Sequence, residues 1–327
     1  MQQAVRVMRA IRMREFGPSS VLRLQTDVPV PSPNDKEVLI RVRACGVNPV
    51  DTYIRTGTHT RRPELPWTPG GDVAGTVESV GRSISSFKAG DRVYTALAEG
   101  GYAEFVCVAH DRVFTLPAQL DFPQGAALGV PYFTAYRALV QKAATRPGET
   151  VLIHGASGGV GIALCQMARA LGTHVIGTAG SPEGLELVAK HGAHSTFDHR
   201  EDGYVGRIQE LYPRGVDVVF EMLANVNLPS DLKLLGQNGR VVIIGCRGAV
   251  EMNPRETLMR ELHVMGVSLF NCNAEERRES AAALHAGVES GWLRPAVGTR
   301  LPLEEAARAH DEIISGSPTL GKMVLTM

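Results

Sequence analysis

The chain has 327 residues, of which 44% are hydrophobic and 21% are charged, and its formal net charge at neutral pH is zero. This length suggests two domains, and the balanced charge excludes a global field that would attract nucleic acid or an anionic membrane. Widely spaced cysteines without a CxxC pair, no apolar run near ~20 residues and no secretory signal lead us to expect a cytoplasmic protein with no membrane partner.

The first part of the chain alternates short β-type runs with Gly and Pro turns. The runs 37–44, 73–80 and 92–95 are rich in Val, and the first alternates apolar and polar residues as a half-buried strand does. Turn residues such as Pro69-Gly70-Gly71 separate the runs. We therefore expect an irregular, mostly antiparallel domain here.

From about residue 150 the pattern changes to short apolar strands that alternate with helices. Strands are expected at 149–154, 174–178, 195–197, 216–220 and 240–245. Helices are expected at 158–171 and 182–191 between them, and at 274–289 and 303–315 before a final strand at 321–326. Alternating strands and helices indicate parallel βαβ units in a doubly wound sheet.

The strongest local signal is the segment 151–161, in which a strand runs into a glycine turn and then a helix. Ala156, Gly158 and Gly161 take the positions of the G-x-G-x-x-G dinucleotide motif, with Ala in the first position. The phosphates of a dinucleotide would lie on the N–H groups at the positive end of that helix. The alternative is a turn that serves packing alone, which the strand before and the βα units after disfavour.

The end of the second strand indicates which dinucleotide is bound. It reads Thr178-Ala179-Gly180-Ser181, with no acidic residue before Glu183. NAD-specific sites usually place an acid there for the ribose 2′-hydroxyl, so its absence favours NADPH. His199 and Arg200, after the third strand, are candidates to meet the 2′-phosphate. The alternative for each is a solvated surface charge.

Several motifs taken together resemble the zeta-crystallin and quinone reductase family, the zinc-free members of the medium-chain dehydrogenase/reductase class. They are the segments 44–53, 69–70, 131–136, 156–161 and 221–227, and the likeness runs through essentially the whole chain. The resemblance implies an α/β protein: a GroES-like, mostly-β catalytic domain at 1–128, completed by 271–327, and a doubly wound parallel Rossmann domain at 129–270 that binds NADPH. It also implies a cytoplasmic homotetramer, or a dimer, that reduces quinones to semiquinones by one-electron transfer.

The same resemblance assigns site residues position by position. Tyr53, Asn48 and Thr134 are the catalytic candidates. The cofactor contacts it implies are Tyr53, Ser157, Gly158, Gly159, Val160, Gly180, His199, Asn227, Ile244, Gly245, Cys246, Arg247, Val267, Ser268 and Leu269. Alternatively, Tyr53 packs its ring on the cofactor without doing chemistry, and Thr134 caps a helix that follows Pro131. One departure is that Glu183 and Gly184 stand where many quinone reductases have a lysine for the 2′-phosphate.

Zinc-dependent alcohol dehydrogenases share this architecture, but their metal ligands are not matched. Asn48 stands where those enzymes have a cysteine, and Gly70-Gly71-Asp72 replaces their Gly-His-Glu. Cys107 stands alone, so the lobe with four closely spaced cysteines is missing as well. A catalytic zinc site needs about three N, S or O ligands. Cys45 is better explained as a buried structural residue, and we expect no metal.

Three functions stay open at this point. Without a Lewis acid, an electrophilic quinone is the favoured substrate, and Tyr53 and Asn48 would donate hydrogen bonds to its oxygen. Reduction of the C=C bond of enones or alkenals, with Tyr53 as proton donor, is the alternative. Family members are also associated with binding AU-rich RNA and with a structural crystallin role in lenses. Arg61-Arg62 and Arg277-Arg278 are basic pairs, but no RNP-type aromatic motif accompanies them.

Overall fold

The computed structural model describes residues 5–315 and 320–327, which separate into two compact units. Within these ranges, the first unit comprises 5–130, 294–315 and 321–327, and the second comprises 131–293 and residue 320. The chain therefore returns to the first unit at residue 294, whereas we expected it to return at 271.

The difference concerns the helix α9 (Ala274–Glu289), which belongs to the second unit. Its bounds match the expected helix. Polar contacts hold it there: Arg137 Nη1 lies 2.7 Å from Glu276 Oε2, and Gln141 Nε2 donates to Glu279 Oε2 at 3.0 Å. Sequence reasoning placed the helix wrongly because a surface helix does not indicate which core it covers.

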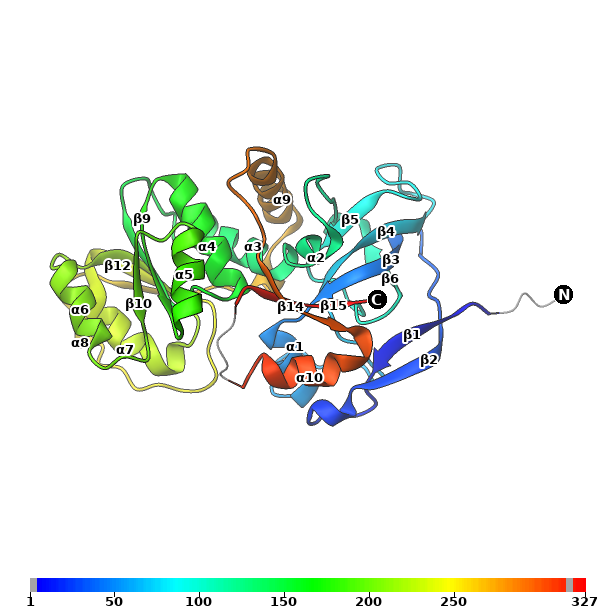
Figure 1. Ribbon diagram of the computed structural model, residues 1–327, viewed down its shortest axis with the longest axis horizontal. Helices are drawn as coiled ribbons and strands as arrows, with labels where there is room; N and C mark the ends of the chain where they lie inside the picture. The colour runs from blue at the N-terminus through cyan, green and yellow to red at the C-terminus, as the bar shows by residue number, and fades with distance from the viewer. Residues whose placement is uncertain (1–4, 316–319) are drawn as a thin grey trace. The chain divides into compact units, whose positions relative to one another are not determined.

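The first unit is built on a mostly antiparallel sheet with the strand order β14-β15-β3-β4-β5-β7, and β6 pairs with β3 (Figure 1). Its strands are β3 (Glu37–Gly46), β4 (Asp72–Val80), β5 (Arg92–Thr95), β6 (Phe105–Ala109), β7 (Val113–Thr115), β14 (Val297–Pro302) and β15 (Lys322–Thr326). A separate antiparallel pair consists of β1 (Val7–Arg12) and β2 (Arg23–Pro29). Alternate residues of β3 such as Val38, Ile40 and Val42 are buried, as the period-2 pattern predicts.

Both ends of the chain contribute to this sheet. Strand β15 pairs antiparallel with β3, with Val324 opposite Gly46 and Leu325 opposite Cys45. The helices of the unit are α1 (Pro49–Thr56), α2 (Phe122–Gly125) and α10 (Ala306–Glu312), with the 3₁₀ turns η1 (Ser19–Val21), η2 (His110–Arg112) and η5 (Leu303–Glu305). A segment at the C-terminal end thus lies directly beside the strand that leads to Asn48.

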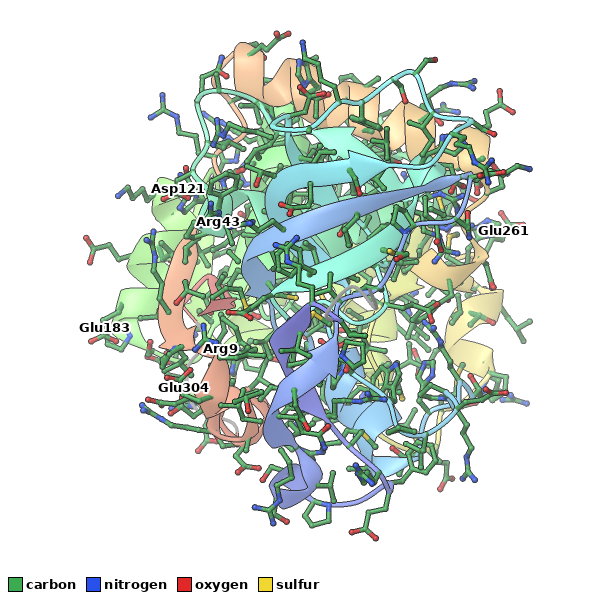
Figure 2. All side chains as sticks on the ribbon, turned by 90° about the vertical axis from the view of Figure 1, so that its right-hand side faces the viewer. Arg9, Arg43, Asp121, Glu183, Glu261 and Glu304 are labelled. Atoms are coloured by element: carbon green, nitrogen blue, oxygen red, sulfur yellow. The ribbon has the colours of Figure 1, made fainter. Side chains whose placement is uncertain are left out.

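Charges of both signs are interspersed on the surface of the first unit. In the face that Figure 2 presents, the basic side chains of Arg9 and Arg43 occur on the same surface as the acidic Asp121 and Glu304. Arg9 pairs with Glu104 through Nε and Oε1, 3.0 Å apart. This distribution agrees with the zero net charge.

The second unit contains a six-stranded parallel sheet with the order β10-β9-β8-β11-β12-β13 (Figure 1). Its strands are β8 (Thr150–Ile153), β9 (His174–Ala179), β10 (Ser195–Asp198), β11 (Val216–Glu221), β12 (Leu235–Ile243) and β13 (His263–Gly266). The strand order reverses between β8 and β11, which is the switch point at which doubly wound sheets bind ligands. The α/β architecture expected from the sequence is confirmed.

Helices and helical turns precede, connect and follow these parallel strands. They are α3 (Gly129–Tyr136), which crosses from the first unit, α4 (Gly159–Leu171), α5 (Pro182–Lys190), α6 (Tyr204–Leu211), α7 (Ala224–Leu234) and α8 (Arg255–Leu258), with the π-helical turn η3 (Arg137–Lys142) and the 3₁₀ turn η4 (Leu269–Asn271). Because the chain moves outward from β8 in one direction and from β11 in the other, right-handed crossovers place α4 and α5 on the opposite face from α7. None of the helices within the described ranges is long and apolar enough to cross a bilayer.

Candidate active site

The candidate catalytic residue Asn48 lies immediately before α1 in the first unit. Pro49 takes the first helical position, where its missing N–H is not needed, and Gly57 ends the helix in the left-handed conformation with φ 75°. Asn48 is buried, with 4% exposure, whereas Tyr53, which lies within α1, is half-buried. Pro49 and Gly57 therefore define the start and the end of α1, and with them the backbone positions of Asn48 and Tyr53.

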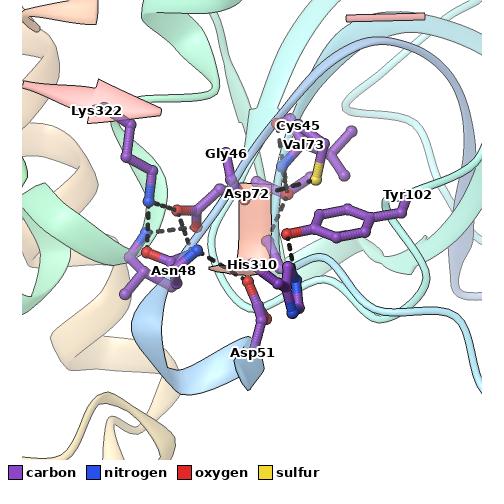
Figure 3. A network of polar contacts seen from close by, with 12 residues as sticks. Cys45, Gly46, Asn48, Asp51, Asp72, Val73, Tyr102, His310 and Lys322 are labelled. Atoms are coloured by element: carbon purple, nitrogen blue, oxygen red, sulfur yellow. Dashed lines mark hydrogen bonds and ion pairs between the residues drawn. The ribbon is translucent and has the colours of Figure 1, made fainter. Parts of the chain in front are cut away.

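The Asn48 amide belongs to a buried network with Asp72 and Lys322 (Figure 3). Asn48 Nδ2 donates to Asp72 Oδ2 at 2.8 Å, and Lys322 Nζ lies 3.0 Å from the same oxygen. Lys322 Nζ also donates to Asn48 Oδ1. Gly46 makes room for the lysine, since a Cβ there would lie 2.6 Å from Lys322 Cε. Both ends of the amide are thus bonded, which fixes its orientation.

A second group of buried polar side chains surrounds the backbone of Asn48 (Figure 3). The Asn48 N–H donates to Asp51 Oδ2 at 3.0 Å, and burial raises the pKa of Asp51 to about 7. Tyr102 Oη lies 3.1 Å from His310 Nε2, and burial lowers the pKa of His310 to about 3. His310 is therefore neutral at neutral pH, so the basic charge beside Asn48 comes from Lys322.

In the second unit, β8 runs into the glycine turn and then α4, as the motif predicts. Gly155 has φ 54°, and a Cβ on Gly161 would lie 2.5 Å from Ala156 Cα, so both positions require glycine. Gly158 is the N-cap of α4 and supplies no side-chain acceptor, and a Cβ there would meet only Gly155 O, at 3.5 Å. The first-turn N–H groups and the open approach fit the pyrophosphate of a dinucleotide.

Gly180, His199 and Arg200 come together at the carboxyl ends of β9 and β10. A Cβ on Gly180 would lie 2.8 Å from His199 Nε2 and 2.9 Å from Arg200 Nε. Both basic side chains are exposed, and the Arg200 N–H donates to Asp198 Oδ1 at 2.8 Å. Since no carboxylate occupies the position directly after β9, these groups fit the adenosine 2′-phosphate of NADPH.

The other predicted cofactor residues also follow the carboxyl ends of parallel strands. They lie in the turn after β8, in the first turn of α4, in α7 after β11, and in the segments after β12 and β13. These residues are Ser157, Gly159, Val160, Asn227, Ile244, Gly245, Cys246, Arg247, Val267, Ser268 and Leu269. A doubly wound sheet binds its ligands at this edge, so the arrangement suits the prediction that these residues contact the cofactor.

The alternative in which Thr134 caps a helix is wrong. Helix α3 begins at Gly129, so Thr134 lies inside it, with 7% exposure. Pro131 occupies the first turn of this helix, where it is tolerated, rather than preceding the helix. The catalytic role of Thr134 stays a prediction.

Comparisons with known proteins agree with this architecture. Residues 34–118 match the alcohol dehydrogenase GroES-like domain, and residues 159–286 match the family described as zinc-binding dehydrogenase. The quinone oxidoreductases of Rattus norvegicus and Homo sapiens are 56% and 54% identical to the chain over 324 residues, which cover 98% of each protein. The structure of Escherichia coli quinone oxidoreductase complexed with NADPH covers 98% of this chain and 100% of that one, with a TM-score of 0.90 and 32% identity. The chain belongs to the quinone oxidoreductase family.

One matched family is described as zinc-binding, and the positions that correspond to the metal ligands of zinc-dependent alcohol dehydrogenases, Asn48 and Gly70-Gly71-Asp72, lie in the first unit. A zinc ion would therefore have to fit the side chains there. The ammonium of Lys322 is bonded to both Asn48 and Asp72, so a cationic group already takes the place next to these oxygens. Cys45 is fully buried in the apolar core, and burial raises the pKa of its thiol well above the ordinary value. Among the described residues of this unit, no three His, Cys, Asp or Glu ligand atoms converge. These side chains do not fit zinc.

Sequence reasoning missed two residues of this family member's site. Lys322 was part of an expected strand, and Asp72 entered only as a replacement for a metal ligand. The sequence does contain a signal for both residues, because Asp72 and Lys322 are each a charged first residue of a strand that continues with apolar residues. Lys and Asp are almost never fully buried unless they are paired.

Proposed function

We propose that this protein reduces quinones with NADPH and without a metal ion. The observation that carries the proposal is the buried Asn48 amide, which Lys322 and Asp72 hold in one orientation. Two quinone oxidoreductases that are 54% and 56% identical to this chain match it over nearly its whole length, which supports the substrate class.

The cofactor is NADPH in this proposal. A related structure, that of Escherichia coli quinone oxidoreductase, is described as complexed with NADPH. In the present chain, the glycine turn before α4 offers N–H groups to the pyrophosphate, and His199 and Arg200 beside Gly180 offer positive charge to the 2′-phosphate. The exposed position of both basic side chains allows them to move onto a ligand.

The role of the protein in the reaction is to stabilise charge on the quinone oxygen. Bound NADPH supplies the electrons: in the proposed one-electron reaction, one NADPH reduces two quinones and releases NADP⁺ and a proton. The second N–H of Asn48 donates to the oxygen that gains negative charge, and the Lys322 ammonium on the other side of the amide strengthens this donor. A donor of this kind contributes about 3–4 kcal/mol to transition-state stability.

Because Lys322 places an ammonium group against the Asn48 amide, the site needs no Lewis acid for a substrate that is already electrophilic. Tyr53 supplies a second donor, a hydroxyl, from helix α1, and its side chain is half-buried. Assembly into a homotetramer and binding of AU-rich RNA are further predictions from the family resemblance, and a cytoplasmic location is a prediction from the cysteine pattern and the resemblance together.

The function is tested by assaying the purified protein with NADPH or NADH against 1,4-benzoquinone and an α,β-unsaturated ketone. We expect quinone-dependent oxidation of NADPH, weaker activity with NADH and an EPR signal from the semiquinone. Turnover of the ketone without turnover of the quinone would make the protein an enone reductase. A two-electron hydroquinone product with no radical signal would contradict the one-electron reaction.

A further inference from the structure

A buried cluster of His154, Glu221 and Asp231 lies at the switch point of the parallel sheet. His154 follows β8, Glu221 ends the neighbouring strand β11, and Asp231 reaches the cluster from α7. Their side chains have 4%, 0% and 1% exposure. Each offers a ligand atom within 4.8 Å of the others, the only such group of three in the part of the chain that the structure describes.

The two carboxylates in this cluster have no Lys or Arg partner among the described residues. Asp231 Oδ2 and Glu221 Oε2 are buried and accept no hydrogen bond. Among the described residues, the ion pairs of Glu221 and Asp231 are with His154 alone, and no Lys or Arg reaches them. Two ionised carboxylates in a dry site are strongly unfavourable, so a cation or protons must neutralise them.

The donor set and its spacing fit a small divalent cation. Imidazole nitrogen and carboxylate oxygen both bind zinc, at about 2.0–2.2 Å, which puts the ligand atoms of a tetrahedral site about 3.4 Å apart. His154 Nε2 lies 2.9 Å from Asp231 Oδ1 and 3.7 Å from Glu221 Oε2, which brackets that spacing. Two carboxylates and one divalent ion also sum to zero charge.

The surroundings of His154 match those of a metal ligand. Its other ring nitrogen, Nδ1, lies 3.3 Å from Thr178 Oγ1. A ligating histidine usually donates its second N–H to an oxygen in this way, which directs the lone pair of the first nitrogen to the ion. Thr178 Oγ1 also accepts the N–H of Gly155, so the contact reaches the glycine turn.

We propose that His154, Glu221 and Asp231 form a structural site for a divalent cation, with zinc as the best match to the donors. The ion would tie together two segments of the nucleotide-binding edge. On one side, Thr178 links His154 to Gly155; on the other, Glu221 Oε1 accepts hydrogen bonds from the Leu223 N–H and from Asn227 Nδ2. The site lies in the second unit, whereas the residues that replace the ligands of zinc-dependent dehydrogenases lie in the first.

The test is metal analysis and calorimetric titration of the full-length protein with ZnCl₂ after dialysis against a chelator. We expect one saturable zinc ion per chain and a higher melting temperature in its presence. The variants Asp231→Asn and Glu221→Gln should lose both effects. A matched control is His174→Gln, which removes one ring of the stacked His174–His194 pair, keeps all three proposed ligands and should leave the ion in place.

Thr178→Val keeps all three ligands, so it tests the site even if the carboxylate variants do not fold. We expect it to weaken zinc binding by about 10–100-fold. The proposal is overturned if the unaltered protein shows no saturable zinc binding, or if Asp231→Asn binds zinc as tightly as the original. In that case a proton shared between the carboxylates neutralises the pair.

Discussion

The ammonium of Lys322 and the carboxylate of Asp72 lie 3.0 Å apart, with side-chain exposures of 5% and 0%, and are separated by 250 positions in the chain. Lys322 begins β15 and Asp72 begins β4, and both strands flank β3. The pair joins the C-terminal strand β15 to β4 beside Asn48, which follows the end of β3. This arrangement couples the stability of the first unit to the orientation of the proposed catalytic amide.

The first prediction concerns the stability of this unit. Lys322→Met leaves the Asp72 charge buried without its cation, and such a loss costs about 3–5 kcal/mol. Thermal or denaturant unfolding should show this decrease in the free energy of unfolding. The double variant Asp72→Asn with Lys322→Met removes both charges and should regain most of the loss. A change below about 1 kcal/mol in the single variant would mean that the pair is effectively solvated.

The second prediction concerns the glycine turn. In Gly161→Ala, the new Cβ would lie 2.5 Å from Ala156 Cα and Gly155 O, which are backbone atoms that cannot move aside easily. The turn must shift, and we expect at least about a 10-fold loss of NADPH affinity, measured by nicotinamide fluorescence. Gly206→Ala on α6 is the control, because its Cβ meets nothing within 4 Å. It should bind NADPH normally; equal affinity in both variants would argue against the turn as the phosphate site.

The third prediction separates NADPH from NADH. Arg200→Gln removes a charged donor for the 2′-phosphate, and a hydrogen bond to a charged group contributes about 1.5–3 kcal/mol. We expect the Kd for NADPH to rise about 10-fold or more, while the Kd for NADH stays the same. Arg207→Gln, which removes an exposed arginine paired with Glu201, should change neither value. A parallel loss for both cofactors would remove the role given to Arg200.

The fourth prediction follows from the raised pKa of Asp51, which burial moves to about 7. The unfolded pKa is about 3.9, so the folded state holds the proton more tightly. This contribution to stability is fully present below about pH 4 and is lost as the pH rises to about 7, at up to about 1.4 kcal/mol per pH unit. Asp51→Asn should remove this dependence from a series of unfolding curves. An identical pH profile in the variant would contradict the assignment.

Local patterns predicted the fold well because they depend on neighbouring residues. The strand, glycine turn and helix at 150–171 follow from the spacing of glycines and apolar residues, and α9 was expected with its observed bounds. Strand β13 was not expected, because its residues are mostly exposed and give no apolar pattern. The unit to which α9 belongs was predicted wrongly, because that depends on contacts with η3.

The candidate site was predicted only in part. Asn48 and the residues after each parallel strand follow from motifs that are contiguous in sequence. Asp72 and Lys322 meet only when β15 pairs with β3, and no local pattern encodes that pairing. Glu221 and His154 carried a usable signal, since each is a polar residue directly after an apolar run of a strand, at the edge where ligands bind.

The role of the Asn48 amide is tested most directly by the steady-state kinetics of Asn48→Ala with saturating NADPH and a quinone. NADPH binding to the same variant is measured by fluorescence. If the amide stabilises charge on the quinone oxygen, kcat should fall about 10²–10³-fold while the Kd for NADPH stays within about 2-fold. An unchanged kcat in a folded variant would contradict the role of Asn48, and with it the purpose assigned to the Lys322–Asp72 pair.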